Sequence, residues 1–550
     1  MKYVDVKNVT VRGDLRARLI KNFSRLHDKI YRSGTAGLPP CCCLGWPGDW
    51  EGRAMLALVL DSEALKTDAA DLENLIAWIY SLMNDEGYRS EPGDKLNLND
   101  INEQMHSAQN WLMRAFMEYY RVTGKTEYLE TVKTILEKLY LPIKPHLKNY
   151  PRTAEDRSYA HEFAVVGKTN GQFREWRLSS DTGCLFMCMD SLAQAWEMID
   201  EEPLHSEIWD LICEMLKTFR NLDYVGGMLQ THATMTGMRG IMRIYKKTGD
   251  PSLLETLKKY FADYEKYGLS ASFANRVNFK ATNCHTEPCG IVDSYMLACQ
   301  LWEETGERHY LDLSNKIWWN GLMRAQRENG GMGCETTVDD GRLKVFDIFY
   351  EAAHCCTMRG AEGLGYPVRH AVRNEAGVLT VPFWFDFDSS IDGGLIKVRT
   401  KLPENGYCSV EFEKAVPGAG ELRLYIPEWA KPEITLNGRR AEFETDGCFA
   451  AVKSDFAHGD KLEIRYEIPL YKLPADFYGH SDRGRCLVMY GNLVLGTETA
   501  LDEKIETGKF EYAGNAEFTA YGRKFVPLHR CRDMSKEEVM VKSWQIVFNE

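Results

Sequence analysis

The sequence has 550 residues, 44% of them hydrophobic, and a formal net charge of −13. This length exceeds what one hydrophobic core usually supports, so we expect two or more domains. The acidic balance argues against a nucleic-acid partner, because nucleic-acid binders gather Lys and Arg on one face.

No stretch approaches the roughly 18 consecutive apolar residues of a membrane span. The first residues, MKYVDVKNVTVRGDLRARL, lack the pattern of a secretory signal. We therefore expect a cytoplasmic protein without a membrane partner. In that compartment, 16 cysteines indicate reduced thiols and metal sites rather than a framework of disulfides.

From Leu15 to Tyr366, apolar residues recur at three- and four-residue spacing, which predicts helices. Three of these helices end at a Thr-Gly pair, where glycine can adopt the left-handed cap, at Gly124, Gly249 and Gly306. Repeated helical hairpins build either a solenoid or a closed α/α-barrel. The irregular repeat lengths and a long insert at 142–181 favour the barrel. We predict an (α/α)6-barrel catalytic domain over residues 1–370.

Two segments within the helical half are rich in metal-ligating side chains. NCHTEPCG, residues 283–290, and AAHCCTMRG, residues 352–360, together supply Cys284, His285, Glu287, Cys289, His354, Cys355 and Cys356. Thiolate, imidazole and carboxylate in a tetrahedral set are ligands that zinc prefers. Residue types alone leave two interpretations open, a metal site and ordinary structural thiols.

Local helix signals support a reactive form of the first thiol. Pro288 suits the first position of a helix, with Thr286 or Glu287 as its cap and Cys289 in its first turn. The helix dipole and free amide groups favour a thiolate there. The neighbours Cys355 and Cys356 cannot easily close a disulfide, so a metal or free thiols are expected.

After Arg369 the pattern changes to short alternating runs with turn residues between them, which predicts strands. Asn437-Gly438 between two such runs predicts a hairpin, because a type I′ turn needs positive φ at both central residues. We therefore predict antiparallel β-sandwich modules over residues 371–550, packed on the barrel.

The run from Thr286 to Gln326 resembles the barrel segment of glycoside hydrolase family 127, the β-L-arabinofuranosidase family, whose members carry Glu-Thr-Cys at the start of this helix. The family's Cys-Cys pair matches Cys355 and Cys356. The similarity extends to WPGDWEGR at 46–53, to QTHATMTG around His232, and to the β-half phrases LRLYIPEWA, ITLNGR and MYGNLVLG.

The resemblance implies a retaining exo-glycosidase that removes a terminal sugar, β-L-arabinofuranose-like or another sugar of plant polysaccharides. It implies a Zn²⁺ cofactor whose ligands are Glu287, Cys289, Cys355 and Cys356. Cys355 would attack the anomeric carbon, and zinc would keep its thiol deprotonated. A closed, purely structural zinc site is the alternative. The matched early segment and QTHATMTG suggest substrate contacts from Asp49, Trp50, Glu51 and His232. The alternatives are an ion pair of Glu51 with Arg53 and an interior role for His232.

The general acid is where this chain departs from the family. A retaining glycosidase needs a carboxyl group that protonates the leaving oxygen. The family's glutamate lies some 16 residues before the metal-ligating glutamate, and Ala271 stands there in this chain. We consider Glu335 and Glu351 as replacements, with a solvated or capping carboxylate as the alternative for each. A helix would place Glu351 on the same face as Cys355, four residues later.

Two other functions remain open. A barrel enzyme acting on sugar acids, a lyase or an unsaturated-uronyl hydrolase, would grip a carboxylate with arginines such as Arg174, Arg177 and Arg276. A non-catalytic carbohydrate-binding protein would keep the zinc as a structural ion. The expected partner is an oligosaccharide or glycoside, and assembly into a homodimer is left open.

Overall fold

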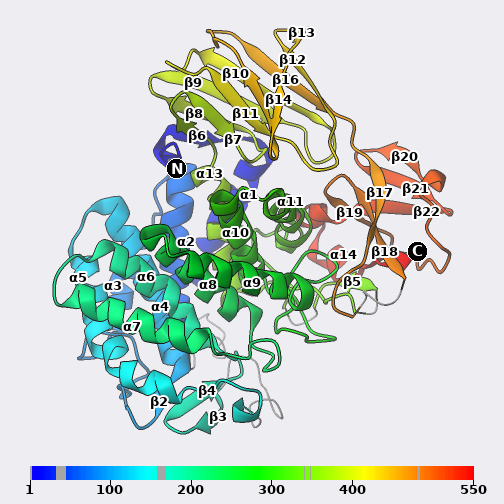
Figure 1. The fold of residues 1–550 in the computed structure, drawn as a ribbon. Coiled ribbons are helices and arrows are strands. Elements are labelled where there is room, and N and C mark those ends of the chain that lie inside the picture. Colours follow the sequence, from blue (N-terminus) through cyan, green and yellow to red (C-terminus); the bar gives the residue numbers. More distant parts are fainter. Residues whose placement is uncertain (1–2, 32–44, 158–168, 340, 347–348, 480–483) are drawn as a thin grey trace.

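The computed structural model describes residues 3–31, 45–157, 169–339, 341–346, 349–479 and 484–550. Figure 1 shows a helical region, a β-sandwich above it and a smaller β-module beside it that contains the C-terminus. This order, helices and then strands, is the predicted one. No helix among the described residues is long and apolar enough to cross a bilayer.

Six helices within the described chain form a closed ring, because each contacts the next and the last contacts the first. In ring order they are α2 (Asp49–Leu65), α4 (Glu103–Thr123), α6 (Cys188–Met198), α8 (Thr231–Thr248), α10 (Pro288–Thr305) and α13 (Cys356–Arg369). Outer helices pack on this ring: α1 (Gly13–Leu26), α3 (Leu72–Ser81), α5 (Glu127–Ile135), α7 (Leu204–Phe219), α9 (Pro251–Tyr267) and α11 (Arg308–Lys316). Inner and outer helices alternate along the chain, which is the arrangement of an (α/α)6-barrel.

The alternation gives the inner helices one direction. Because an outer helix returns the chain between each pair of inner helices, the inner N-termini meet at one end of the barrel. Gly124, Gly249 and Gly306 end α4, α8 and α10 at the other end, with φ of 71°, 69° and 71°. A Cβ at any of these glycines would have no neighbour within 4 Å, so the left-handed conformation is the reason for glycine. The three predicted caps are confirmed.

Two sheets form the sandwich that follows the barrel. One has the order β1-β8-β9-β10-β16-β12-β13 and the other β14-β15-β11-β7-β6. Their bounds are β1 (Val9–Val11), β6 (Arg373–Glu375), β7 (Val378–Val381), β8 (Phe387–Ile391), β9 (Gly394–Thr400), β10 (Tyr407–Lys414), β11 (Glu421–Tyr425), β12 (Pro432–Leu436), β13 (Arg439–Arg440), β14 (Glu444–Asp446), β15 (Phe449–Lys453) and β16 (Lys461–Tyr466). Neighbours are antiparallel except β11 and β7, which pair in parallel. Asn437 and Gly438 both have positive φ between β12 and β13, as the hairpin prediction required.

One strand from before residue 370 joins this sandwich. β1 pairs with β8 through Val9 opposite Ser389, so the N-terminal segment completes a sheet that otherwise comes from the second half of the chain. The boundary predicted at residue 370 follows the end of α13 at Arg369. A single hydrophobic cluster continues from the barrel into the sandwich, which keeps the two parts in fixed contact.

The C-terminal module has a sheet with the order β17-β18-β19-β22-β21-β20, and β24 pairs with β18. The strands are β17 (Leu470–Pro474), β18 (Arg485–Tyr490), β19 (Leu493–Gly496), β20 (Glu511–Gly514), β21 (Glu517–Ala520), β22 (Arg523–Pro527) and β24 (Phe548–Asn549), with the short helix α14 (Lys536–Val541). The module also reaches the barrel, because β23 (Ser543–Gln545) pairs with β5 (Arg342–Lys344) in the loop before α13. A small sheet of β2 (Ile101–Asn102), β3 (Thr169–Phe173) and β4 (Trp176–Ser179) lies before α6.

Candidate active site

Four side chains meet at the N-termini of α10 and α13. A ligand atom of each of Glu287, Cys289, Cys355 and Cys356 lies within 4.8 Å of the others. Glu287 is the N-cap of α10 and Pro288 its first residue, which places Cys289 in the first turn as predicted. Cys355 is the N-cap of α13 and Cys356 its first residue. Adjacent residues at a helix start can thus turn both thiols toward α10.

The spacing of the sulfur atoms fits a tetrahedral ion. The Cys289 and Cys356 sulfurs are 3.5 Å apart, and those of Cys355 and Cys356 are 3.4 Å apart. Two thiolates bound to one zinc at about 2.3 Å with tetrahedral angles stand about 3.8 Å apart. Three sulfurs and one carboxylate also match the donor types that zinc prefers. The residues present therefore fit a zinc ion.

Burial opposes negative charge in this group. It raises the pKa of Glu287 to about 8, and the charge of Asp181 contributes to the same shift. Burial also raises the pKa of the Cys289 and Cys356 thiols well above their ordinary range. A divalent cation favours the ionised form of every ligand and so reverses this trend.

Arg53, in the first turns of α2, connects the group to the neighbouring inner helices. One guanidinium nitrogen, Nη1, donates to the Cys289 sulfur at 3.7 Å, and Nη2 lies 3.5 Å from Nε2 of His232. The Nε–H donates to Asp49 at 2.9 Å. The guanidinium also lies 3.8 Å from the ring centroid of Trp111, a cation–π contact. Arg53 thus holds a fixed positive charge beside the thiols.

His232 is oriented from the barrel interior. Its Nδ1 lies 2.7 Å from Oδ2 of the buried Asp293, so Nδ1 is the protonated nitrogen and Nε2 points toward Arg53. Burial lowers the pKa of His232 to about 4, which keeps the imidazole neutral. The ring stacks on Trp111 with 5.8 Å between centroids. The structure therefore combines an interior position with a nitrogen that faces the site.

Asp293 belongs to a buried network to which every inner helix contributes. Asp293 accepts from Arg239 at 2.9 Å and from Arg359 at 2.5 Å, and Arg239 also donates to Glu362 at 2.7 Å. Arg114 joins Glu362 at 3.1 Å and also pairs with Asp190. The members are Arg53 on α2, Arg114 on α4, Asp190 on α6, His232 and Arg239 on α8, Asp293 on α10, and Arg359 and Glu362 on α13. The barrel interior is thus filled with paired charges behind the site.

We expect the substitution Asp293→Asn to lower the free energy of unfolding by about 3 kcal/mol, because two buried arginines lose their shared anion. Burial alone would raise the pKa of Asp293, but Arg359, His232 and Arg239 lower it well below its ordinary value. Its contribution is therefore complete above the unfolded-state pKa of about 3.9 and is lost as the pH falls through the lower folded-state pKa. Urea unfolding at pH 7 and at lower pH measures this.

The exposed Glu255 provides the control for that experiment, since Glu255→Gln should change stability by less than about 0.5 kcal/mol. If Asp293→Asn unfolds at the same urea concentration as the wild type at pH 7, the network does not support the barrel.

Three predicted substrate contacts come from the start of α2, and only one faces the group. Asp49 is bound to Arg53 and lies beside the site. Trp50 is 1% exposed and packs between Tyr31 and Trp78 in the core. Glu51 accepts from Arg89 at 3.1 Å. The alternative pairing of Glu51 with Arg53 is therefore wrong, because Arg53 pairs with Asp49 instead.

Glu335 and Glu351 lie near the site but are occupied by cations. Glu335 accepts from Arg327 at 2.9 Å and from Arg324 at 3.2 Å. The carboxylate of Glu351 accepts from Arg25, Tyr31, Asn329 and Thr357. The helix expected over Glu351 and Cys355 is absent here, since α13 begins only at Cys356. Both carboxylates are therefore engaged as acceptors in fixed contacts with other segments.

The other residues of the two ligand-rich segments remain outside the metal group. His285 stacks on Phe346 with 4.9 Å between centroids, and His354 contacts Phe349. The Cys284 sulfur lies 3.8 Å from the carbonyl of Ala281. Ala271, which stands where the family has its acidic glutamate, is completely buried. None of these residues belongs to the metal group.

The structure adds two residues that the sequence did not indicate. Nε2 of Gln230 lies 3.4 Å from Oε2 of Glu287, and its main-chain N–H donates to the carbonyl of Thr182 at 3.0 Å. This places the adjacent Asp181 at the same rim, where its charge affects Glu287. Asp181 precedes Gly183, whose positive φ begins the turn into α6. In the sequence, the only feature that could have indicated Asp181 was its place shortly before the start of an inner helix.

The three arginines considered for a sugar-acid enzyme do not converge. Arg174 donates to Asn149, Arg177 pairs with Asp100, and the completely buried Arg276 binds Asp339 at 2.6 Å. Each guanidinium is bound to a different segment. The structure thus gives no support for a carboxylate grip by these three residues.

Comparisons with known proteins cover both halves of the chain. Residues 51–366 match the family model of the GH127 β-L-arabinofuranosidase catalytic domain, and residues 388–468 match the model of the GH127 middle domain. No curated protein matches the sequence. A solved GH127 β-arabinofuranosidase, BT3674, has 11% identity and a TM-score of 0.69, with 99% of this chain and 97% of that one covered. Ara127N-Se, a GH127 β-L-arabinofuranosidase from Geobacillus stearothermophilus T6, has 14% identity and a TM-score of 0.66, with 99% and 100% covered.

Proposed function

The chain belongs to the GH127 β-L-arabinofuranosidase family and is a glycoside hydrolase, and from this premise we propose that it hydrolyses with retention of configuration. The substrate is a glycoside with a terminal β-L-arabinofuranose-like sugar, and Cys355 is the nucleophile. The observation that carries this proposal is the convergence of Glu287, Cys289, Cys355 and Cys356 at the inner N-termini.

The chemistry of the first step follows from this convergence. Zinc bound by the four side chains supplies a positive charge that keeps the thiols deprotonated. The charge of Arg53 and the free amide groups at the start of α13 favour the ionised form at Cys355, and they act against the contact with Cys356 and the burial that raise the pKa of this thiol. The Cys355 sulfur donates an electron pair to the anomeric carbon, the glycosidic C–O bond breaks, and a carboxyl proton passes to the leaving oxygen.

The second step restores the enzyme. Water attacks the anomeric carbon of the thioglycosyl enzyme from the face that the leaving group occupied, and its proton returns to the carboxylate. The C–S bond breaks with its electron pair on sulfur. Two inversions at one carbon give a product with the configuration of the substrate.

We assign the proton transfers to Asp181. Asp181 lies at the rim defined by Gln230 and Glu287, where its charge acts on Glu287. It is partly exposed, so a substrate can reach it. Its position in the segment before α6, away from the start of α13 at Cys355, suits an acid that acts across the substrate.

The substitution Asp181→Asn is expected to lower kcat/KM for an alkyl glycoside by about 10²- to 10⁴-fold, because the poor leaving group needs the proton. For an aryl glycoside with an acidic phenol the loss should be much smaller, and added azide should restore turnover and yield the glycosyl azide. The exposed Asp200, beyond the other end of α6, provides the matched control Asp200→Asn. Equal losses of kcat/KM for the alkyl and the aryl glycoside would show that Asp181 is not the general acid.

The stereochemical course tests the function itself. We expect proton NMR during hydrolysis of an aryl β-L-arabinofuranoside to show the β-anomer of the free sugar first, followed by slow mutarotation. Initial release of the α-anomer would contradict the retaining mechanism. If the protein hydrolyses another aryl glycoside but not the arabinofuranoside, the proposed mechanism still holds and the proposed sugar is wrong.

A further inference from the structure

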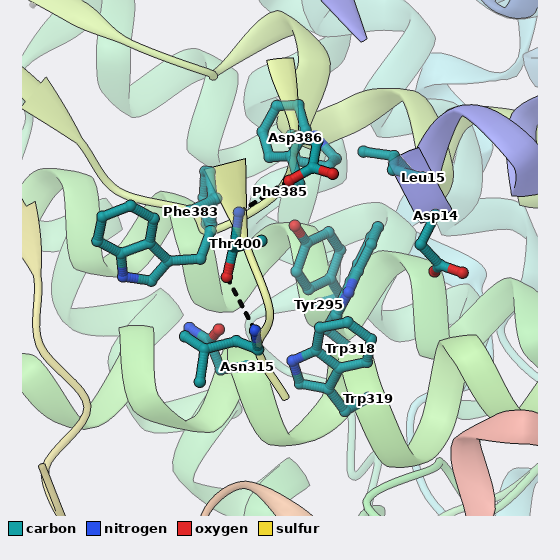
Figure 2. Close-up of a pocket in the computed structure, with 13 residues that line it drawn as sticks. Asp14, Leu15, Tyr295, Asn315, Trp318, Trp319, Phe383, Phe385, Asp386 and Thr400 are labelled. Atoms are coloured by element: carbon teal, nitrogen blue, oxygen red, sulfur yellow. Dashed lines mark hydrogen bonds between the residues drawn. The ribbon is translucent and has the colours of Figure 1, made fainter. Parts of the chain in front are cut away.

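A separate cavity lies where the barrel meets the sandwich. Its volume is about 80 Å³, several times the roughly 10–15 Å³ that a cavity needs to hold one water molecule. Figure 2 shows side chains from α1, α10 and the helical turn η7 (Ile317–Leu322) facing residues of the segment between β7 and β8. Pro367, near the end of α13, also lines it. Eleven residues separate Pro367 from Cys356 (367 − 356), so the cavity is about 16 Å along the helix from the metal group.

Six of the thirteen residues that line the cavity are aromatic. They are Tyr295, Trp318, Trp319, Phe383, Trp384 and Phe385. Trp318 and Trp319 are partly exposed, so the cavity is reachable from solvent. Trp319 and Trp384 also line a smaller neighbouring cavity that adds Trp429. The indole N–H of Trp384 donates to the carbonyl of Tyr425 at 2.9 Å, which fixes the orientation of this ring. Aromatic residues thus line both cavities, which share Trp319 and Trp384.

Two polar side chains of the cavity have unused acceptors. Oδ1 of Asp386 accepts from the main-chain N–H of Thr400 at 2.8 Å. Within the described chain, Oδ2 of Asp386 and the Asn315 carbonyl oxygen have no hydrogen-bond donor, although Nδ2 of Asn315 donates to Leu311. A Cβ at Gly13, where φ is +56°, would lie 2.3 Å from Oδ2 of Asp386. Glycine at this position therefore leaves room for the carboxylate.

The remaining carboxylate of the cavity is already occupied. Asp14 pairs with Arg18 at 2.8 Å and with Arg532. The cavity therefore offers one carboxylate oxygen and one neutral amide oxygen as acceptors between aromatic faces.

We propose that this cavity is a second, non-catalytic carbohydrate site that binds one neutral monosaccharide unit, such as the terminal ring of a glycan. The apolar C–H face of a sugar packs on an aromatic ring, and its hydroxyl groups donate to acceptors at the edge. Aromatic cages for quaternary ammonium ions instead surround the ligand with ring faces, and their cation has no donor for an amide. The acceptors of Asp386 and Asn315 therefore favour a sugar over a cation.

The experiment measures sugar binding and hydrolysis separately in the full-length protein. L-Arabinose, D-xylose and D-galactose are titrated while intrinsic Trp fluorescence is recorded, and crystals are soaked in the sugar with the tightest response. We expect a sugar ring in this cavity, and a Kd at least about tenfold weaker in Asp386→Ala, because one hydrogen bond to a partly buried charged group is lost. Hydrolysis of an aryl glycoside by this variant should equal that of the wild type.

Several outcomes would overturn the proposal. One is a soaked crystal with sugar only at Cys355 and Glu287. Another is equal sugar affinity in the wild type, Asp386→Ala and Asn315→Ala, and a third is preferential binding of tetramethylammonium. If Asp386→Ala fails to fold, the soaked wild-type crystal decides the matter alone. If the wild type binds a sugar in this cavity but hydrolyses no glycoside, the result counts against the mechanism at Cys355 and not against the cavity. The two proposals can therefore fail separately.

Discussion

Replacement of Cys355 by alanine is expected to lower kcat by about 10⁴-fold or more, because the bond-forming atom of the reaction is removed. The position of the partly buried Cys355 beside Cys356 and its place at the start of α13 are the structural reasons for assigning this role. The variant should still bind zinc, since Glu287, Cys289 and Cys356 remain. Steady-state kinetics and metal content measured on the same sample distinguish loss of the nucleophile from loss of the ion.

A covalent label gives an independent measurement of the same role. A bromoacetamide glycoside should add one mass equivalent to the wild type at Cys355 and none to Cys355→Ala. Cys284→Ala is the matched control, because this thiol lies on the neighbouring loop outside the metal group. Full activity of Cys355→Ala, or labelling of Cys284 in place of Cys355, would refute the assignment.

Removal of zinc should affect both activity and stability. We expect one equivalent of zinc per chain after purification without chelator, and a loss of at least about 3 kcal/mol of stability on its removal. Without the ion, the four buried ligand groups at the starts of α10 and α13 lose their shared partner. Burial raises the pKa of Glu287 and Cys289, so both groups then take up protons. Metal analysis and thermal unfolding before and after chelation measure both quantities without reference to turnover.

Two cysteines of α10 provide the matched pair for this experiment. Cys289→Ser should leave zinc below one equivalent and reproduce the lower thermal midpoint, whereas Cys299→Ser, further along the same helix, should bind zinc normally. A wild-type protein that contains no zinc, or a chelated protein with an unchanged midpoint, would argue against a metal centre.

The sequence was informative where a function depends on local signals. Thr-Gly pairs identified the ends of three inner helices, because only glycine adopts the left-handed cap readily at such an end. Pro288 after Glu287 located the start of α10 and hence the position of Cys289. The Cys355–Cys356 pair was found by residue type, and its convergence with α10 followed from the family resemblance.

The acid was harder to predict because its position depends on contacts between distant segments. Glu351 appeared suitable from helical spacing, but the chain before Cys356 is not helical and Arg25 approaches from α1. Glu335 is occupied in the same way by Arg324 and Arg327. Asp181 gave no local signal beyond its place before Gly183, and the pairing of Gln230 with Thr182 and Glu287 brings it to the site. Such tertiary pairings leave no periodic trace in a sequence.

The paired charges in the barrel interior have a consequence for how this chain can diverge. Arg239 is shared between Asp293 and Glu362, and Arg114 between Glu362 and Asp190, so no member has a single partner. Neighbours in one network show strong non-additivity, and an isolated charge reversal would leave several buried ions uncompensated. Substitutions there should therefore be epistatic. Exposed surface residues outside the site can vary one at a time, whereas the interior behind it can change only by compensating sets of exchanges on several helices.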